Sequence, residues 1–211
     1  MLGQSISRNS FLLGCFAVAT TLLIAGTWLG TRDQIATEQR KAESRALLEI
    51  VPDEQHDNSM LDDTLPVGPT AEGLGLREDK KIYLARQGER VVAAILPATA
   101  TDGYSGDIDM IVGVYADGRV AGVRVLNHRE TPGLGDQIDL KKSDWVLEFD
   151  GRSLENPTLA GWTVKKDQGV FDQFTGATIT PRAVIAATRR VLQYAEANRQ
   201  TLFDEDVEGD T

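Results

Sequence analysis

The chain has 211 residues, 41% of them apolar, and a formal net charge of -10, which provides enough apolar material for one ordinary domain and a short appendage. The acidic balance argues against a nucleic-acid-binding protein, because phosphate neutralisation requires a basic face and the lysines and arginines form no cluster. Cys15, His56 and His128 are the only cysteine and histidines, so a disulfide framework is excluded and a transition-metal enzyme is disfavoured.

Residues 11–30 form an uncharged apolar run, FLLGCFAVATTLLIAGTWLG. A helix of this length, at about 1.5 Å per residue, matches a hydrocarbon core of roughly 30 Å, so we expect a transmembrane helix. A cleaved secretory signal is the alternative, but its apolar region is usually about 7–15 residues long and ends in a small-residue cleavage pattern that this run lacks. Cys15 is interpreted as an ordinary apolar residue of the span.

The charges that flank the run favour a cytoplasmic location for the rest of the chain only weakly. One arginine, Arg8, precedes the run, and four basic residues follow it: Arg32, Arg40, Lys41 and Arg45. Long domains are exported despite such charges, and acidic residues are interleaved with these four. The side of the membrane therefore does not follow from the charge count.

Strong helix formers continue from residue 31 to about residue 50 and predict a helix that leaves the membrane. Pro52 is expected to end it. Residues 52–74 combine Pro, Gly, Asn and Asp with few β-branched residues, and we interpret them as a loop or wrapped segment. The compact domain is expected to begin after this segment.

Two pairs of β-branched runs predict an antiparallel sheet in that domain. The first pair, over residues 81–98, flanks Gln87-Gly88-Glu89, and the second, over residues 108–126, flanks Ala116-Asp117-Gly118. A glycine between such runs is a strong hairpin signal because it supplies the positive φ that a tight turn demands.

A long helix is predicted near the end of the domain. Thr180 followed by Pro181 is typical of an N-cap and a first helical position. Apolar positions then recur at helical spacing and form one face that can pack on the sheet: Val184, Ile185, Thr188, Val191, Leu192 and Ala195. The expected fold is α+β, a single N-terminal transmembrane helix followed by a twisted antiparallel sheet packed against helices.

The segment FDQFTGATIT, residues 171–180, stands directly before this helix and has two interpretations. In the first, Thr175 and Thr178 merely belong to a loop that leads into the helix. In the second, Thr178 holds a phosphate, because a helix N-terminus presents unsatisfied N–H groups and a partial positive charge.

Residues 172–178, DQFTGAT, resemble the D-x-x-[ST]-G-A-T pattern at which a dedicated flavin transferase esterifies FMN to the last threonine. Residues 103–106, GYSG, and 130–135, ETPGLG, resemble the G-Y-x-G and E-T-P-G-L-G motifs of the same FMN-binding domains of bacterial respiratory complexes. With the N-terminal anchor, the whole chain resembles the G subunit of the Rnf-type (Rsx-type) electron transport complexes. The related C subunit of the sodium-pumping NADH:quinone oxidoreductase, which is usually longer, is the alternative.

This resemblance implies that Thr178 carries FMN through a phosphoester on its Oγ, transferred from FAD with loss of AMP by a magnesium-dependent flavin transferase. Small residues beside it would let the transferase and the cofactor approach the backbone. The E-T-P-G-L-G loop would line the flavin. The expected cofactor-binding residues are Thr178, Asp172, Thr175, Gly176, Ala177, Glu130, Thr131 and Leu134.

Other residues have weaker interpretations. Trp145 and Trp162 are candidates for stacking on the ring, although a core position is the commoner role of such aromatics. Glu130 and Asp136 could be interpreted as the carboxylate pair of a hydrolase, but this is disfavoured because no other catalytic groups accompany them. His128 is interpreted as a residue at the end of a strand.

The resemblance further implies a membrane-anchored electron carrier, a redox subunit of a translocase and not a self-contained enzyme. Its partners would be the flavin transferase and other membrane subunits that couple ferredoxin and NAD chemistry to ion transport. The protein would be single-pass in the bacterial inner membrane with its soluble domain in the periplasm. The alternatives are a flavin-free anchored assembly module and an enzyme with reversibly bound FMN. The expected organisation is a tail (1–10), the transmembrane helix (11–30), a juxtamembrane helix and linker (31–74), the FMN-binding domain (75–202) and an acidic tail (203–211).

Overall fold

The computed structural model describes residues 2–203, which divide into two compact units between Glu43 and Ser44. Helix α1 (Leu2–Leu48) runs through the whole described part of the first unit. Its segment Ser10–Ile35 has the length and composition of a membrane span, and its apolar window is 0% buried. The span expected over residues 11–30 lies inside this segment. From position 204 onwards the expected acidic tail lies outside the described residues.

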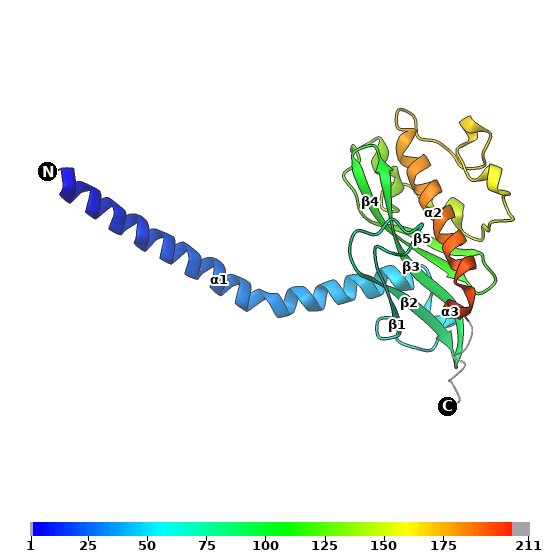
Figure 1. Cartoon of the computed structure of the whole chain (residues 1–211), viewed down its shortest axis with the longest axis horizontal. Coiled ribbons are helices and arrows are strands. Elements are labelled where there is room, and N and C mark those ends of the chain that lie inside the picture. The colour runs from blue at the N-terminus through cyan, green and yellow to red at the C-terminus, as the bar shows by residue number, and fades with distance from the viewer. Residues whose placement is uncertain (1, 204–211) are drawn as a thin grey trace. The chain divides into compact units, whose positions relative to one another are not determined.

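The second unit is built on a five-stranded antiparallel sheet in which each strand pairs with the next along the chain (Figure 1). The strands are β1 (Thr64–Val67), β2 (Lys80–Gln87), β3 (Arg90–Gly103), β4 (Gly106–Tyr115) and β5 (Val120–Asn127). Two helices follow the sheet, α2 (Ile179–Ala197) and α3 (Arg199–Phe203). The α+β fold is therefore confirmed.

Both predicted hairpins are confirmed, and a third is present. Gly88 (φ 63°) lies in the β2–β3 turn and Gly118 (φ 84°) in the β4–β5 turn, so glycine supplies the positive φ in each. The third hairpin joins β3 to β4, because β3 continues to Gly103, which pairs with Gly106 across the turn.

Strand β1 lies in the segment that was expected to be a loop. It contains Pro66, and it forms an edge of the sheet by pairing only with β2. Proline has no N–H to donate, which an edge strand tolerates because one of its sides has no partner strand. Composition therefore predicted a loop where a short edge strand forms.

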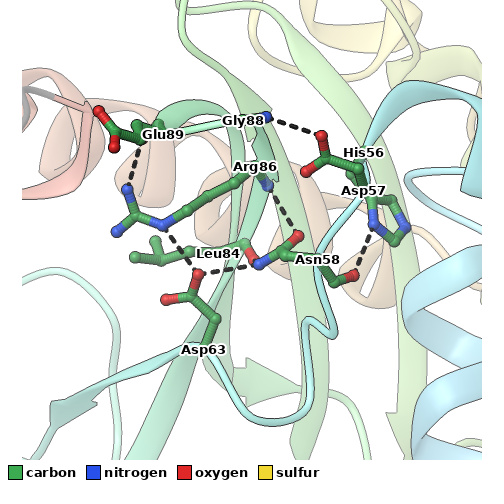
Figure 2. A network of polar contacts seen from close by, with 8 residues as sticks. All are labelled: His56, Asp57, Asn58, Asp63, Leu84, Arg86, Gly88 and Glu89. Carbon is green, nitrogen blue, oxygen red and sulfur yellow. Dashed lines mark hydrogen bonds and ion pairs between the residues drawn. The ribbon is translucent and has the colours of Figure 1, made fainter.

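Polar contacts bind the chain just before β1 to the β2–β3 hairpin (Figure 2). The Asn58 side chain accepts a hydrogen bond from the Arg86 N–H (2.9 Å) and donates to the Leu84 carbonyl (3.0 Å) and Asp63 Oδ2 (2.8 Å). Arg86 Nε donates to the same Asp63 oxygen (2.8 Å). These bonds attach the segment to the sheet and leave it little freedom as a linker.

Apolar side chains cover the sheet on both faces. On one face α2 packs across β3 and β4, with Leu84, Ala94 and Leu96 in the same core cluster as the helix. On the other face Leu47, Ile50, Val51 and Met60 pack against Tyr83, Ala85, Ala93 and Ile95. Alternate residues of β3 thus enter different clusters, and each large apolar side chain buried in this way contributes about 1.5–3 kcal/mol.

The apolar face of α2 is confirmed, since its six predicted members are all buried. The predicted start of this helix is wrong. Helix α2 begins at Ile179, which places Thr178, not Thr180, at the N-cap and makes Pro181 the third helical residue. Thr180 is fully buried, and its hydroxyl donates to the Glu130 carboxylate (2.5 Å), so a tertiary contact overrides the local capping pattern. Proline is tolerated there because the first N–H groups of a helix have no acceptor within it.

Between β5 and α2 the chain follows an irregular course around a cluster of rings, Trp145, Phe149, Trp162, Phe171 and Phe174. Along this course lie the short 3-10 helices η2 (Gly135–Ile138), η3 (Asp144–Phe149), η4 (Leu159–Gly161) and η5 (Lys165–Asp167), and η1 (Asp53–Gln55) precedes β1. The cluster includes the two rings just before the T-G-A-T turn, which anchors that turn at the start of α2.

Candidate functional site

Three sequence motifs meet at the N-terminal end of α2. Glu130, in the loop after β5, accepts the Thr180 hydroxyl through Oε2 (2.5 Å) and the Ser105 N–H of the β3–β4 turn through Oε1 (2.9 Å). Glu130 itself is 4% exposed. The β3–β4 turn and the start of α2 lie at the same end of the sheet in Figure 1. The G-Y-S-G, E-T-P-G-L-G and T-G-A-T segments are therefore neighbours in space.

Two glycines allow backbone to approach the Glu130 carboxylate closely. A Cβ at Gly135 would lie 2.7 Å from Glu130 Oε2 and 2.9 Å from Thr180 Oγ1. A Cβ at Gly103 would lie 3.0 Å from Glu130 Oε1 and would clash with the carbonyl oxygen of Gly106. A side chain at either position would displace this carboxylate or the backbone, so the glycines of both motifs have a packing role.

Thr178 is half-buried and occupies the N-cap of α2, yet its side chain makes no capping hydrogen bond. The turn before it is accessible, with Thr175 and Gly176 exposed. Gly176 has a φ of 83°, a left-handed conformation that favours glycine, and the turn closes with the Ala177 N–H donating to the Phe174 carbonyl (3.2 Å). The structure thus presents the Thr178 hydroxyl at a helix N-terminus without engaging it as a cap.

Three exposed apolar side chains border the meeting point of the motifs, namely Tyr104 (69% exposed), Leu134 (40%) and Ile179 (47%). We call them the apolar rim. A Cβ at Gly176 would lie 3.3 Å from Leu134 Cδ2, so this leucine is beside the T-G-A-T turn. Tyr104 and Ile179 are adjacent in sequence to the two residues that donate to Glu130. Large exposed apolar side chains gathered at one place are typical of a binding surface.

Asp172, the first residue of the D-x-x-T-G-A-T pattern, is exposed, but its carboxylate, N–H and carbonyl each make a polar contact. Its carboxylate pairs with Lys165 Nζ (2.5 Å), its N–H donates to Glu148 Oε2 (3.1 Å), and its carbonyl accepts the Trp145 indole N–H (2.9 Å). The hydrogen bond to Asp172 raises the pKa of Lys165. Burial raises the pKa of Glu148, and the nearby Asp172 charge adds to that rise. The contacts hold the start of the pattern in a fixed position.

The other residues of the E-T-P-G-L-G loop shape the loop itself. Thr131 is exposed, and its carbonyl accepts the Leu134 and Gly135 N–H groups, each at 3.1 Å. Asp136 Oδ1 accepts the Gly133 N–H (2.7 Å). His128 directly follows β5, as predicted, and its Nδ1 accepts the Glu130 N–H (3.1 Å).

Both tryptophans weighed as ring-stacking candidates are core residues. Trp145 is 5% exposed and packs edge-on against Phe149 and Phe174. Trp162 is 3% exposed, and its indole N–H donates to the Ser153 carbonyl (3.0 Å). Their aromatic surface is taken up by the core, which leaves the apolar rim as the exposed apolar surface beside Thr178.

Sequence reasoning missed Thr180 as a member of this site. Its pairing with Glu130 spans 50 positions along the chain, so no local pattern could indicate it. The structure also contains a hollow of about 780 Å³ between the chain after β1 and the second half of α2, lined by Gly73, Arg190 and Tyr194 among others. This hollow lies away from the residues that precede α2.

Comparison with known proteins supports the importance of these segments. Residues 103–193 match the family of FMN-binding domains, a range that begins at Gly103 and includes all three motifs. Residues 1–50 match the family described as the RnfG N-terminal region. The match of both parts agrees with the order of anchor and domain along the chain.

Full-length relatives give the same result. A protein of Pseudomonas aeruginosa (strain UCBPP-PA14) is 51% identical over 95% of this chain and 93% of its own length. Proteins of Shewanella loihica and Pseudoalteromonas atlantica are 48% and 46% identical, over 95% of this chain and over 94% and 93% of their own lengths. All three are described as the G subunit of the ion-translocating oxidoreductase complex. This decides between the two related families weighed from the sequence: the chain belongs to the RnfG family of ion-translocating oxidoreductase complexes.

Proposed function

We propose that this chain is an electron-carrying subunit that holds FMN through a phosphoester bond to Thr178 Oγ. The observation that carries the proposal is the state of the Thr178 hydroxyl, which stands at the N-cap of a 19-residue helix and makes no capping bond. It follows an accessible turn whose sequence is the attachment pattern. The match of residues 103–193 to FMN-binding domains supports the choice of cofactor.

The start of α2 suits a phosphate. The N–H groups of the first two helical residues, Ile179 and Thr180, have no acceptor within the helix, the third residue being Pro181, and the helix dipole adds partial positive charge. A phosphodiester on Thr178 would retain one negative charge, which this terminus stabilises by about 0.3–1 kcal/mol. The ester oxygens would take the place that the threonine side chain leaves vacant as a cap.

The apolar rim suits the flavin ring. Leu134 lies beside the T-G-A-T turn and Ile179 directly follows Thr178, and both expose large apolar surfaces. A ring laid against them would remove apolar area from water on both partners, at about 25 cal/mol per Å².

When bound, FMN supplies one-electron and two-electron redox chemistry. The residues of this chain bind the phosphate, orient the ring along the apolar rim and limit water on the covered side. The immediate electron partners are other membrane subunits of the same complex, which is supported by the description of the relatives as one subunit of an oxidoreductase complex.

Maturation requires a flavin transferase that reaches Thr178 from outside. Thr175, Gly176 and Asp172 are exposed, so the attachment pattern is open to a second protein. We place the domain in the periplasm of a bacterial inner-membrane protein anchored by α1, where a covalent bond would prevent loss of the cofactor. A phosphatase fused after residue 203 tests this side, since such a reporter is active only when exported.

The attachment itself is tested by coexpression with a flavin transferase, followed by a denaturing gel viewed for flavin fluorescence. The wild-type band and a Thr158→Ala control, which changes an exposed threonine outside the pattern, should fluoresce. A Thr178→Ala band should be dark, and the intact wild-type mass should exceed that of the variant as expected for one FMN ester.

Two results would contradict the proposal. Flavin released from wild-type protein on denaturation would indicate reversibly bound FMN. A dark wild-type band, with the transferase active on another target, would favour the flavin-free assembly module.

A further inference from the structure

We propose that Glu130 is a positioning residue that holds the flavin attachment site in one preformed arrangement. The inference rests on the proposed function of Thr178. It concerns the Glu130 junction, which we define as Glu130 with Ser105, Thr180, Gly103 and Gly135. Glu130 is not part of the attachment pattern and lies 48 positions before Thr178 in the sequence.

The carboxylate lies where three chain segments converge. Oε1 accepts from the Ser105 N–H (2.9 Å), Oε2 accepts from the Thr180 hydroxyl (2.5 Å), and Glu130 is 4% exposed. Within residues 2–203 the carboxylate forms no ion pair with a lysine or arginine, so these two hydrogen bonds are what satisfies it. A buried carboxylate held in this way fixes the positions of its donors, because moving either one leaves a buried oxygen unsatisfied.

Each contact of the junction is close to a residue of the proposed flavin site. Thr180 is two residues beyond Thr178, and Ile179 lies between them. Ser105 follows Tyr104, and Gly135 follows Leu134, whose Cδ2 approaches the Gly176 backbone. A shift at the junction is therefore transmitted over one or two residues to Thr178 and to every member of the apolar rim.

The glycines make the arrangement tight. The positions of a Cβ at Gly103 and at Gly135 fall 3.0 Å and 2.7 Å from the two carboxylate oxygens. A side chain at either glycine would therefore crowd the carboxylate. This explains in physical terms why the G-Y-S-G and E-T-P-G-L-G segments accompany an attachment motif that neither of them contains.

The test compares Glu130→Ala, Glu130→Gln and Thr180→Val with Thr188→Val as the matched control. Thr188 is also a fully buried threonine of α2, but its hydroxyl donates only to the Val184 carbonyl of its own helix (2.9 Å). Glutamine can keep both contacts, because its oxygen accepts from Ser105 and its amide donates to the threonine hydroxyl. Alanine keeps neither, and Thr180→Val removes one.

Full-length apo-protein in detergent is incubated with FAD, magnesium and the transferase, and the initial rate of attachment is measured per folded molecule against protein concentration. The anisotropy of the attached flavin reports how firmly the ring is held. We expect the specificity constant for attachment to fall at least about tenfold in Glu130→Ala, to fall less in Thr180→Val and to stay near wild type in Glu130→Gln and Thr188→Val. The two impaired variants should also show lower flavin anisotropy.

If Glu130 only stabilised the fold, the substitutions would lower the unfolding temperature but leave the attachment rate and the flavin anisotropy of the folded protein unchanged. If folded Thr180→Val had the same attachment rate and flavin anisotropy as the wild type, the proposal would be overturned. This test remains valid even if Glu130→Ala does not fold. Failure of attachment in the wild type would instead contradict the proposed function of Thr178, so the two failures are distinguishable.

Discussion

Replacing Thr180 by valine should destabilise the domain more than the same replacement at Thr188. The two residues are matched, since both are threonines of α2 with no exposed surface. Valine has nearly the same shape as threonine, so packing changes little and the lost hydroxyl dominates. Thr180 donates to a buried carboxylate (2.5 Å), whereas Thr188 donates to a carbonyl of its own helix (2.9 Å).

The expected magnitudes follow from the acceptors. A hydrogen bond to a charged group contributes about 1.5–3 kcal/mol and one between neutral groups about 0.5–1.5 kcal/mol. Thr180→Val should therefore reduce the free energy of unfolding by about 1 kcal/mol more than Thr188→Val. In a Glu130→Gln background the two costs should become similar, because the Thr180 hydroxyl then accepts a hydrogen bond from a neutral amide and no longer donates to a charged carboxylate.

Urea unfolding of the apo-protein in detergent measures this difference through tryptophan fluorescence. Trp145 and Trp162 lie in the core and report its loss, whereas Trp28 lies in the apolar segment of α1 and is silenced by Trp28→Phe. Equal costs for the two valine substitutions in the wild-type background would refute the reasoning, because the Glu130 contact would then be worth no more than an ordinary bond to a carbonyl.

Three further outcomes are expected. Asn58→Ala removes three half-buried hydrogen bonds and should cost about 1–3 kcal/mol in urea unfolding, whereas Asn127→Ala at an exposed site should cost almost nothing. Gly176→Ala forces alanine into a left-handed conformation (φ 83°), which costs about 1–2 kcal/mol, and should slow flavin attachment, measured by in-gel fluorescence. Burial raises the pKa of Glu148, so the folded state binds a proton more readily than the unfolded state. Stability should therefore fall as pH rises from the pKa of Glu148 in the unfolded state to its higher pKa in the folded state. In Glu148→Gln the unfolding temperature should depend less on pH over this range.

The parts of the fold that follow from the sequence are those fixed by neighbouring residues. Gly88 and Gly118 between β-branched runs predicted two hairpins, and the apolar spacing along α2 predicted its buried face. Strand β1 could not be predicted in this way, because Pro66 is acceptable only once the strand is known to be at an edge. Its position depends on the contacts of Asn58 and Asp63 with Arg86 of β2, which join distant segments.

The candidate site divides in the same manner. The three motifs and Thr178 were identified from their residues, since each is short and contiguous. Glu130 was expected to lie near the ring because of its loop, but sequence gave no sign that its carboxylate is buried and receives two bonds from other segments. Burial of a charged side chain depends on donors supplied by the whole fold, and local patterns do not contain them.

The N-cap of α2 is Thr178 and not the predicted Thr180, and the start of the helix explains why the Thr178 hydroxyl makes no capping bond. An N-cap side chain normally accepts the N–H of the second or third helical residue. In α2 the third residue is Pro181, which has no N–H to give. Thr178 itself has helical φ and ψ (−86° and −24°) and not the extended backbone typical of an N-cap, while the hydroxyl of the second residue, Thr180, joins the first turn to the E-T-P-G-L-G loop through Glu130. Thr178 is thus the residue at the helix start whose hydroxyl neither caps nor joins the junction, and a threonine in that position is suited to form an ester without loss of a contact on which the fold depends.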